Sequence, residues 1–337
     1  MEALWVVFPV LQHVLLYEGD DDMPPFDAIL ESLRSSLAAT LGSFAPLAGK
    51  LVLGDGVPGR DAGHHAVLRP LARQDARRRR AGQECSAEVR SQFALGVAPA
   101  LFFSDQIFTH VHTAALASSV FEDRKRLTRR TFTLDQGDIQ RLKLRIVHLN
   151  ESGGTPLPRP PSAFAAVVAL AWTCFARCKS FSLDDDVWLF FFADIRERLD
   201  PPVGAGYIGS CLTKCLARLP ARELHGERAL AAAASAVQDE INKMKEDPIA
   251  GWNFFSFDPM PAMDRLMNIS GSSGFSAYKI ADFGWGKPTR TEPIRMNTDG
   301  QVALMGSRDD RGVQVSVALL QAAQMDEFKS NFLALLE

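Results

Sequence analysis

The sequence predicts an α/β fold in which long helices flank mixed sheets. Residues 187–193 (Val-Trp-Leu-Phe-Phe-Phe-Ala) form a continuous apolar run of strand length, which is typical of a strand buried on both faces. Residues 164–178 are apolar over the length of a helix. Residues 313–319 carry Val or Leu at every second position, the pattern of a half-buried strand. A chain of 337 residues can build two such domains or one large domain.

The composition is that of an ordinary globular protein, with 47% hydrophobic and 23% charged residues. A formal net charge of −3 gives no reason to expect nucleic acid or an anionic membrane as a partner. No apolar run approaches the roughly 20 residues of a membrane span, and the first residues lack the basic start of a signal peptide. Five cysteines without framework spacing favour a reduced compartment, so we expect a cytoplasmic location. We also expect a monomer.

The first segment predicts a strand followed by a helix. Residues 5–17 are densely apolar but contain Pro9, which favours an extended edge segment. Asp27 can cap a helix that runs to about residue 41 and ends at Gly42. The apolar face of this helix is expected to hold Ile29, Leu30, Leu33, Leu37 and Leu41.

Residues 55–92 differ in character from the rest of the chain. They contain no Phe, Trp or Tyr and are rich in arginine, including the run at residues 77–80. Such a stretch buries too little apolar surface to offset its ordering entropy, so we interpret it as a solvated insertion. A nucleic-acid patch is the less favoured interpretation, because no aromatic residues are interleaved. His110 and His112 are spaced like metal ligands on a strand, but no third ligand is evident and no metal site is predicted.

The second half alternates strands with helices. Residues 129–134 predict a short strand, and Asp135 can cap the helix after it. Residues 150–161, rich in Gly, Ser and Pro, predict a loop that Ser162 ends by starting the next helix. The remaining expected features are a helix within residues 220–246, turns at 299–300 and 309–312, and a last helix at 321–335.

Residues 278–288 predict a sharp structural corner. The apolar residues Phe275, Tyr278 and Ile280 indicate an extended run that leads into Asp282. Glycines on both sides of Trp285 allow the backbone to turn sharply. The third glycine of a dinucleotide-binding loop is missing, so no nucleotide site is predicted.

The same corner resembles the signature of the plant BAHD acyltransferases, which move an acyl group from a coenzyme A thioester to an alcohol or amine. Residues 282–286 read Asp-Phe-Gly-Trp-Gly, and residues 196–202 with 207–211 resemble a second family segment, apart from Ile208 and Ser210. The resemblance covers roughly residues 1–54 and 94–337 and is closest to the malonyltransferase branch. That branch acts on phenolic and flavonoid glucosides.

The catalytic motif of that family, His-x-x-x-Asp, is not intact. None of the seven histidines is followed four residues later by aspartate. Residues 64–68 (His-His-Ala-Val-Leu) resemble the start of the motif, but Arg69 and Pro70 stand where Asp-Gly would follow. By resemblance His65 is the candidate general base, although a loop histidine in the solvated tract is the favoured interpretation. A natural deletion and a gene-model error both remain open as causes.

The resemblance implies a two-domain architecture of a coenzyme A-dependent acyltransferase. Residues 1–126 would form an incomplete first domain, with the arginine-rich tract at 55–92, and residues 127–337 the second. Arg196 and Asp282 would form an ion pair that orients the corner. The structural-motif residues implied are Asp282, Phe283, Gly284, Trp285, Gly286, Arg196, Tyr207 and Gly209.

The implied function is transfer of an acyl group, with malonyl-CoA as the donor of the branch, to a hydroxyl of a phenolic or flavonoid glucoside. Acyl-CoA would be a co-substrate, and no bound cofactor is expected. Because the motif is disrupted, we expect weak or absent activity, which leaves the enzyme assignment open. The alternatives are a non-catalytic acyl-CoA-binding or regulatory protein and a fragment that folds poorly.

Overall fold

The structure is a computed structural model that describes residues 13–18, 24–43, 50–53, 66–69, 126–155, 159–203, 211–252, 259, 261–293, 296 and 298–337. Its contacts divide the chain into two units that interleave along the sequence. The first consists of Met1–Pro9, Gly19–His112 and Ala205–Gly209, and the second of Val10–Glu18, Thr113–Gly204 and Ser210–Glu337. The predicted boundary between residues 126 and 127 remains a prediction.

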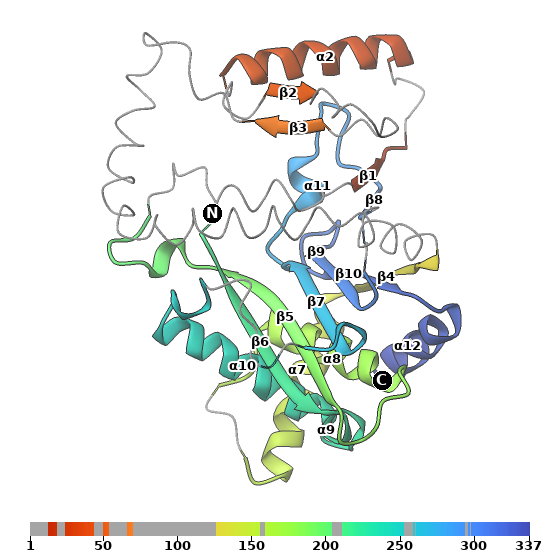
Figure 1. Ribbon diagram of the computed structural model, residues 1–337. Helices are drawn as coiled ribbons and strands as arrows, with labels where there is room; N and C mark the ends of the chain where they lie inside the picture. Colours follow the sequence, from red (N-terminus) through yellow and green to blue (C-terminus); the bar gives the residue numbers. More distant parts are fainter. Residues whose placement is uncertain are drawn as a thin grey trace, which may run out of the picture. The chain divides into compact units, whose positions relative to one another are not determined.

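The second unit is built on a six-stranded mixed sheet with the order β4-β10-β9-β7-β5-β6 (Figure 1). The pairs β5–β7 and β7–β9 are parallel, and the other neighbours are antiparallel. This confirms the predicted α/β class with a mixed sheet. The strands are β4 (Thr128–Leu134), β5 (Asp186–Asp194), β6 (Leu212–Pro220), β7 (Leu266–Gly271), β9 (Gln301–Gly306) and β10 (Val313–Leu319).

Helices that start at predicted positions pack on this sheet. The Asp135 side chain accepts from the backbone N–H of Asp138, and the Asp138 side chain accepts from that of Asp135, a reciprocal capping box. Ser162 caps the next helix through the N–H of Ala165. Helix α12 lies against β4 and β10, while α10 lies against β6. The helices are α7 (Gln136–Ser152), α8 (Ala163–Arg177), α9 (Ala221–His225), α10 (Ala229–Glu246) and α12 (Ala322–Ala334).

The core of this unit centres on α8, where Trp172 is fully buried. Phe132 of β4 stacks on Phe332 of α12 with ring centroids 4.4 Å apart, which places this face of the sheet against the helices. The four described cysteines are buried, as is common for free cysteines in a protein core. Their positions are Cys174, Cys178, Cys211 and Cys215.

The opposite face of the sheet is also covered, which corrects the prediction for residues 313–319. All seven residues of β10 are buried, including the polar Gln314 and Ser316 that were expected to face solvent. The cover comes from α11 (Ala277–Ile280) and β8 (Arg290–Pro293), whose side chains and backbone bond to that face. Burial therefore follows from distant segments that the alternation cannot reveal.

The prediction of an extended run before Asp282 is also wrong, because α11 is a short helix. Its apolar residues do not share one strand face: Ala277 and Tyr278 are neighbours in sequence and both buried, in contact with Met305. Phe275 and Ile280 are exposed. A helical turn accommodates this pattern, and the N–H of Ile280 bonds to the carbonyl of Ser276.

Strand β1 (His13–Leu16) pairs with β8 in antiparallel register and belongs to the second unit. The first unit contains α2 (Phe26–Ser43) and the antiparallel pair β2 (Lys50–Leu53) and β3 (Ala66–Arg69). Asp27 lies in the first turn of α2 rather than at its cap, and a negative charge there favours the helix dipole. Leu37, predicted for the apolar face, is exposed.

Strand β3 falls within the tract predicted as a solvated insertion, so the prediction is wrong for those four residues. Three of them, Ala66, Val67 and Leu68, are apolar and can pair as a strand. The rest of residues 55–92 lies outside the described ranges. Among the described residues, no helix is both long and apolar enough to cross a membrane.

Candidate functional site

The corner at residues 282–286 is a hydrogen-bonded turn that closes on its own carboxylate. Asp282 Oδ1 accepts the backbone N–H groups of Gly284 at 2.8 Å and Gly286 at 3.1 Å. The φ angles of the two glycines are +96° and +85°. A Cβ at either position would meet nothing within 4 Å, so backbone conformation rather than space requires glycine there.

The two aromatic side chains of this turn form a cluster with the ring of Tyr17. The ring centroid of Tyr17 lies 6.3 Å from that of Phe283 and 6.2 Å from that of Trp285, both edge to face. The Phe283 and Trp285 centroids are 6.1 Å apart. These are the distances and orientations that aromatic pairs favour. Residue 17 therefore contributes directly to the corner.

The Tyr17 hydroxyl also donates a hydrogen bond to the carbonyl oxygen of Ala281. Burial of the hydroxyl, followed by the negative charge of Asp282, raises the pKa of Tyr17 above its ordinary value. The hydroxyl consequently keeps its proton at neutral pH and remains a donor.

The chain after the corner is tied to β1. Thr289 donates to the carbonyl of Leu16 from its backbone N–H at 2.7 Å and from its hydroxyl at 3.1 Å. The β1–β8 ladder then continues to Pro293 opposite His13. The corner is thus held on the side of residues 13–18 by both backbone and side-chain contacts.

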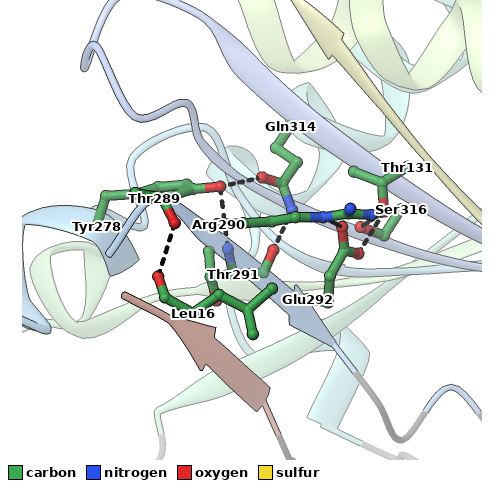
Figure 2. A network of polar contacts seen from close by, with 9 residues as sticks. All are labelled: Leu16, Thr131, Tyr278, Thr289, Arg290, Thr291, Glu292, Gln314 and Ser316. Carbon is green, nitrogen blue, oxygen red and sulfur yellow. Dashed lines mark hydrogen bonds and ion pairs between the residues drawn. The ribbon is translucent and has the colours of Figure 1, made fainter. Parts of the chain in front are cut away.

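A buried polar network holds the corner on the other side (Figure 2). The Tyr278 hydroxyl donates to Gln314 Oε1 at 2.7 Å, and Gln314 Nε2 donates to the carbonyl of Thr291 at 2.8 Å. The N–H of Thr291 donates to the Tyr278 hydroxyl at 3.2 Å. All three residues are buried, so each of these polar groups needs the partner it has.

A second, more exposed part of the network joins β8 to β4 and β10, as Figure 2 shows. The Thr131 hydroxyl donates to Glu292 Oε2 at 2.6 Å, so the 2.9 Å contact with Ser316 must be donated by the Ser316 hydroxyl. Arg290 Nε donates to Glu292 Oε1 at 2.7 Å. The Glu292 carboxylate therefore gathers two donors at the sheet.

The predicted ion pair between Arg196 and Asp282 is not formed between these two described residues. Arg196 Nε lies 3.6 Å from Asp194 Oδ2, and its backbone N–H donates to Asp194 Oδ1 at 3.0 Å. Asp282 uses its Oδ1 for the two glycine amides instead. Both glycines adopt a positive φ, and their N–H groups bond to this one carboxylate oxygen.

Three predicted site residues, His65, Tyr207 and Gly209, lie outside the described residues. The structure brings together Asp282, Phe283, Gly284, Trp285 and Gly286. The sequence interpretation missed Tyr17, Thr291 and Gln314. The only signal for Gln314 was its place in an alternating strand, which could not say what would cover it.

Three of the four described thiols are held in the protonated form, and the described residues contain no candidate metal centre. Burial raises the pKa of Cys178 to about 12 and that of Cys215 to about 12, and it raises that of Cys174 well above its ordinary value. These thiols remain protonated and unreactive at neutral pH. Within the described residues, no group of three or more His, Cys, Asp or Glu side chains could hold a metal ion.

The geometry of the corner is therefore that of a structural element. Its carboxylate is engaged by two amides, and its remaining side chains are aromatic. Hydrogen bonds tie it to its own backbone, to β1 and to β10, so the corner can position neighbouring segments.

Comparisons with a family model and with individual proteins point to the same family of transferases. Residues 103–335 match the family model described as Transferase family. Phenolic glucoside malonyltransferase 2 of Arabidopsis thaliana is 29% identical over 213 residues, which cover 60% of this chain and 44% of that protein. Malonyl-coenzyme:anthocyanin 5-O-glucoside-6'''-O-malonyltransferase of Salvia splendens is 30% identical over 216 residues, which cover 61% of this chain and 44% of that protein. The chain thus spans less than half the length of these two relatives.

Solved structures support the fold. TRI101 of F. sporotrichioides, crystallised with coenzyme A and T-2, aligns with a TM-score of 0.50 at 18% identity. The alignment covers 60% of this chain and 48% of that one.

Proposed function

Because the chain belongs to the Transferase family, the BAHD acyltransferases, we propose that it is an acyl-CoA-dependent O-acyltransferase by descent. The observation that carries the proposal is the family match over residues 103–335, which includes the corner at 282–286. The acceptor proposed is a hydroxyl of a phenolic or flavonoid glucoside. Its support is that the two relatives described above are malonyltransferases of a phenolic glucoside and of an anthocyanin glucoside.

The proposed reaction is a single acyl transfer. A general base removes the proton of the acceptor hydroxyl, and the oxygen attacks the thioester carbonyl. The tetrahedral intermediate then expels the coenzyme A thiolate, which takes up a proton to give the free thiol. His65 is the candidate base by resemblance to the family motif, and the donor proposed is malonyl-CoA. Acyl-CoA is a co-substrate in this scheme.

We propose that transfer by this chain is weak or absent. None of the seven histidines is followed four residues later by the aspartate of the motif. General base catalysis is typically worth roughly 10²–10⁴ in rate, and loss of positioning adds to any deficit. We further propose a monomer located in the cytoplasm, in line with five cysteines that lack framework spacing, and a role in specialised metabolism, in line with the family branch.

Turnover of the full chain tests the proposal. Malonyl-CoA and a simple phenolic glucoside are incubated with the protein, released thiol is measured, and the product ester is identified by mass spectrometry. The Arabidopsis relative serves as the positive control, and the His65→Ala and His64→Ala variants as a matched pair. We expect product at least about 100-fold more slowly than with the relative, and a further loss in His65→Ala alone would identify His65 as the base. A rate equal to that of the relative would overturn the claim of weak activity.

A thermal melt with and without malonyl-CoA separates the remaining outcomes. A cooperative melt that shifts upward with the donor supports a working donor site, because binding to the folded state raises the midpoint. Such a shift without turnover would instead identify a non-catalytic acyl-CoA-binding protein. A cooperative melt that malonyl-CoA does not move would contradict the proposed donor. Absence of a cooperative transition would indicate a chain that does not fold alone.

A further inference from the structure

We infer that Gln314 is a positioning residue that fixes the corner segment, defined here as residues 279–290, to the six-stranded sheet. Its side-chain amide bonds to Tyr278, which immediately precedes this segment, and to Thr291, which immediately follows it. A single buried side chain of β10 therefore holds both flanks of the corner. A role of Gln314 in acyl transfer rests on the proposed function. Its role in holding the corner segment on the sheet does not.

The three hydrogen bonds form a closed ring with one consistent direction of donors (Figure 2). Thr291 donates to Tyr278, Tyr278 donates to Gln314, and Gln314 donates back to Thr291. Rotating the amide by half a turn would place its carbonyl against the Thr291 carbonyl, two acceptors with no proton between them. The amide therefore has a single allowed orientation, which specifies where both flanks lie.

The hydrogen-bond ring is buried, so breaking it costs more free energy than breaking a ring at the surface. Gln314 and Tyr278 are each 4% exposed, and Thr291 is fully buried. Removing one partner leaves buried groups without a hydrogen bond, which is costlier than losing a bond at the surface. Gln314 itself stands on an interior strand, paired with β4 on one side and β9 on the other. Its position is consequently fixed by the sheet and not by the corner.

Ser316 provides a matched comparison on the same strand. It lies two residues after Gln314 on the same face and is also buried. Its hydroxyl bonds to Thr131, which leads to Glu292 but makes no bond to α11. Loss of this bond affects only the flank after the corner. Comparing variants at positions 314 and 316 therefore distinguishes loss of a contact to both flanks from loss of any buried polar group.

Hydrogen exchange measured by mass spectrometry on the full chain tests the inference without any substrate. The variants are Gln314→Leu, Tyr278→Phe and Ser316→Ala. For Gln314→Leu we expect exchange in peptides covering residues 282–290 to rise at least about tenfold, while peptides of α8 stay unchanged. Tyr278→Phe should give a smaller rise in the same peptides, and Ser316→Ala little change there. If Gln314→Leu does not fold, the exchange of Tyr278→Phe at residues 282–290 relative to α8 tests the inference instead.

Gln314→Glu adds a readout that a purely structural role would not move. A protonated carboxyl can replace the amide, because it accepts from Tyr278 and donates to Thr291, whereas a carboxylate cannot donate. We expect its exchange in residues 282–290, divided by that of the wild type at the same pH, to be near one in acid and to rise with pH. Equal exchange in Gln314→Leu and wild type, or a rise of the same size in α8, would overturn the inference. A turnover rate equal to that of the Arabidopsis relative would contradict only the proposed weak activity and would leave this inference untouched.

Discussion

The Tyr17 hydroxyl donates a hydrogen bond to the carbonyl of Ala281, a residue 264 positions further along the chain. The same tyrosine ring packs against Phe283 and Trp285. Residues 10–18 accordingly belong to the second unit, although most of the sequence around them belongs to the first. The corner is therefore completed by a segment from the opposite end of the sequence. Its stability should respond to changes at residue 17.

We expect Tyr17→Phe to destabilise the second unit by about 1 kcal/mol at neutral pH, since it removes one hydrogen bond and keeps the ring. The pKa of Tyr17 in the folded chain lies above its ordinary value of 10.0, chiefly because of burial and then because of Asp282. The folded state thus holds the phenolic proton more tightly than the unfolded state does. This contribution is complete below about pH 10 and is lost as the pH rises through the folded pKa.

Urea unfolding at a series of pH values checks this prediction. The wild type should lose free energy of unfolding more steeply than Tyr17→Phe above about pH 10, and the difference between them should be constant below about pH 9. The buried thiols also titrate at high pH, but they are common to both proteins and cancel in the difference. A difference that stays constant through pH 11 would contradict the role assigned to the hydroxyl.

Gly284→Ala should destabilise the corner by about 1–2 kcal/mol, because its φ of +96° is unfavourable for a residue with a Cβ. Nothing lies within 4 Å of that Cβ, so the cost is purely conformational. Gly284→Asn should cost less than alanine, since asparagine tolerates a positive φ better. Denaturant unfolding measures the three proteins.

Gly226→Ala is the control for this prediction. Gly226 has a φ of −65°, and a Cβ there would lie 3.5 Å from the nearest atom, an ordinary contact. Its substitution should stay within about 0.5 kcal/mol of the wild type. Equal losses at positions 226 and 284 would show that backbone conformation is not what selects glycine at the corner.

Labelling of the thiols should be slow in the folded chain. Burial raises the pKa of Cys178 and of Cys215 to about 12 and that of Cys174 well above its ordinary value, so the reactive thiolate is scarce at pH 8. We expect alkylation at these positions, followed by peptide mass spectrometry, to be at least about 100-fold slower than in guanidinium-unfolded protein. Native labelling as fast as that of unfolded protein would place these residues outside the core.

Local signals in the sequence predicted several helices and strands of the fold correctly. Ser162 and the apolar run after it predicted a helix at residues 164–178, and α8 spans Ala163–Arg177. Asp135 predicted a cap in the same way. Both signals act within a few residues, where hydrogen bonding and periodicity decide the structure.

Relationships between distant segments were not accessible in this way. The alternation at residues 313–319 identified the strand, but only α11 and β8 determine that Gln314 is buried. The ion pair expected from the family is not formed between Arg196 and Asp282, and Asp282 bonds to amides two and four residues away. The residues of the turn itself can be read from the sequence, whereas the partners that hold the turn come from other parts of the chain.

The ion pair between Lys179 and Asp299 is expected to be the most sensitive charge contact among the described residues. Their side chains are 7% and 21% exposed, and Lys179 also lies 5.4 Å from the centre of the Phe175 ring. Asp299→Asn keeps the acceptor for the backbone N–H of Leu320 but leaves the Lys179 ammonium buried without its counter-charge. We expect this to cost about 3 kcal/mol, since breaking a buried pair strands one charge.

The exposed pair of Arg222 and Asp184 is the matched control, with side chains 58% and 86% exposed. Asp184→Asn should change the free energy of unfolding by less than about 0.5 kcal/mol. In the double variant Lys179→Met with Asp299→Asn, the loss should be smaller than the sum of the two single losses, because no charge remains stranded. Additive losses in urea unfolding would contradict a coupled buried pair. Losses of similar size in Asp299→Asn and Asp184→Asn would show that burial does not set the strength of these contacts.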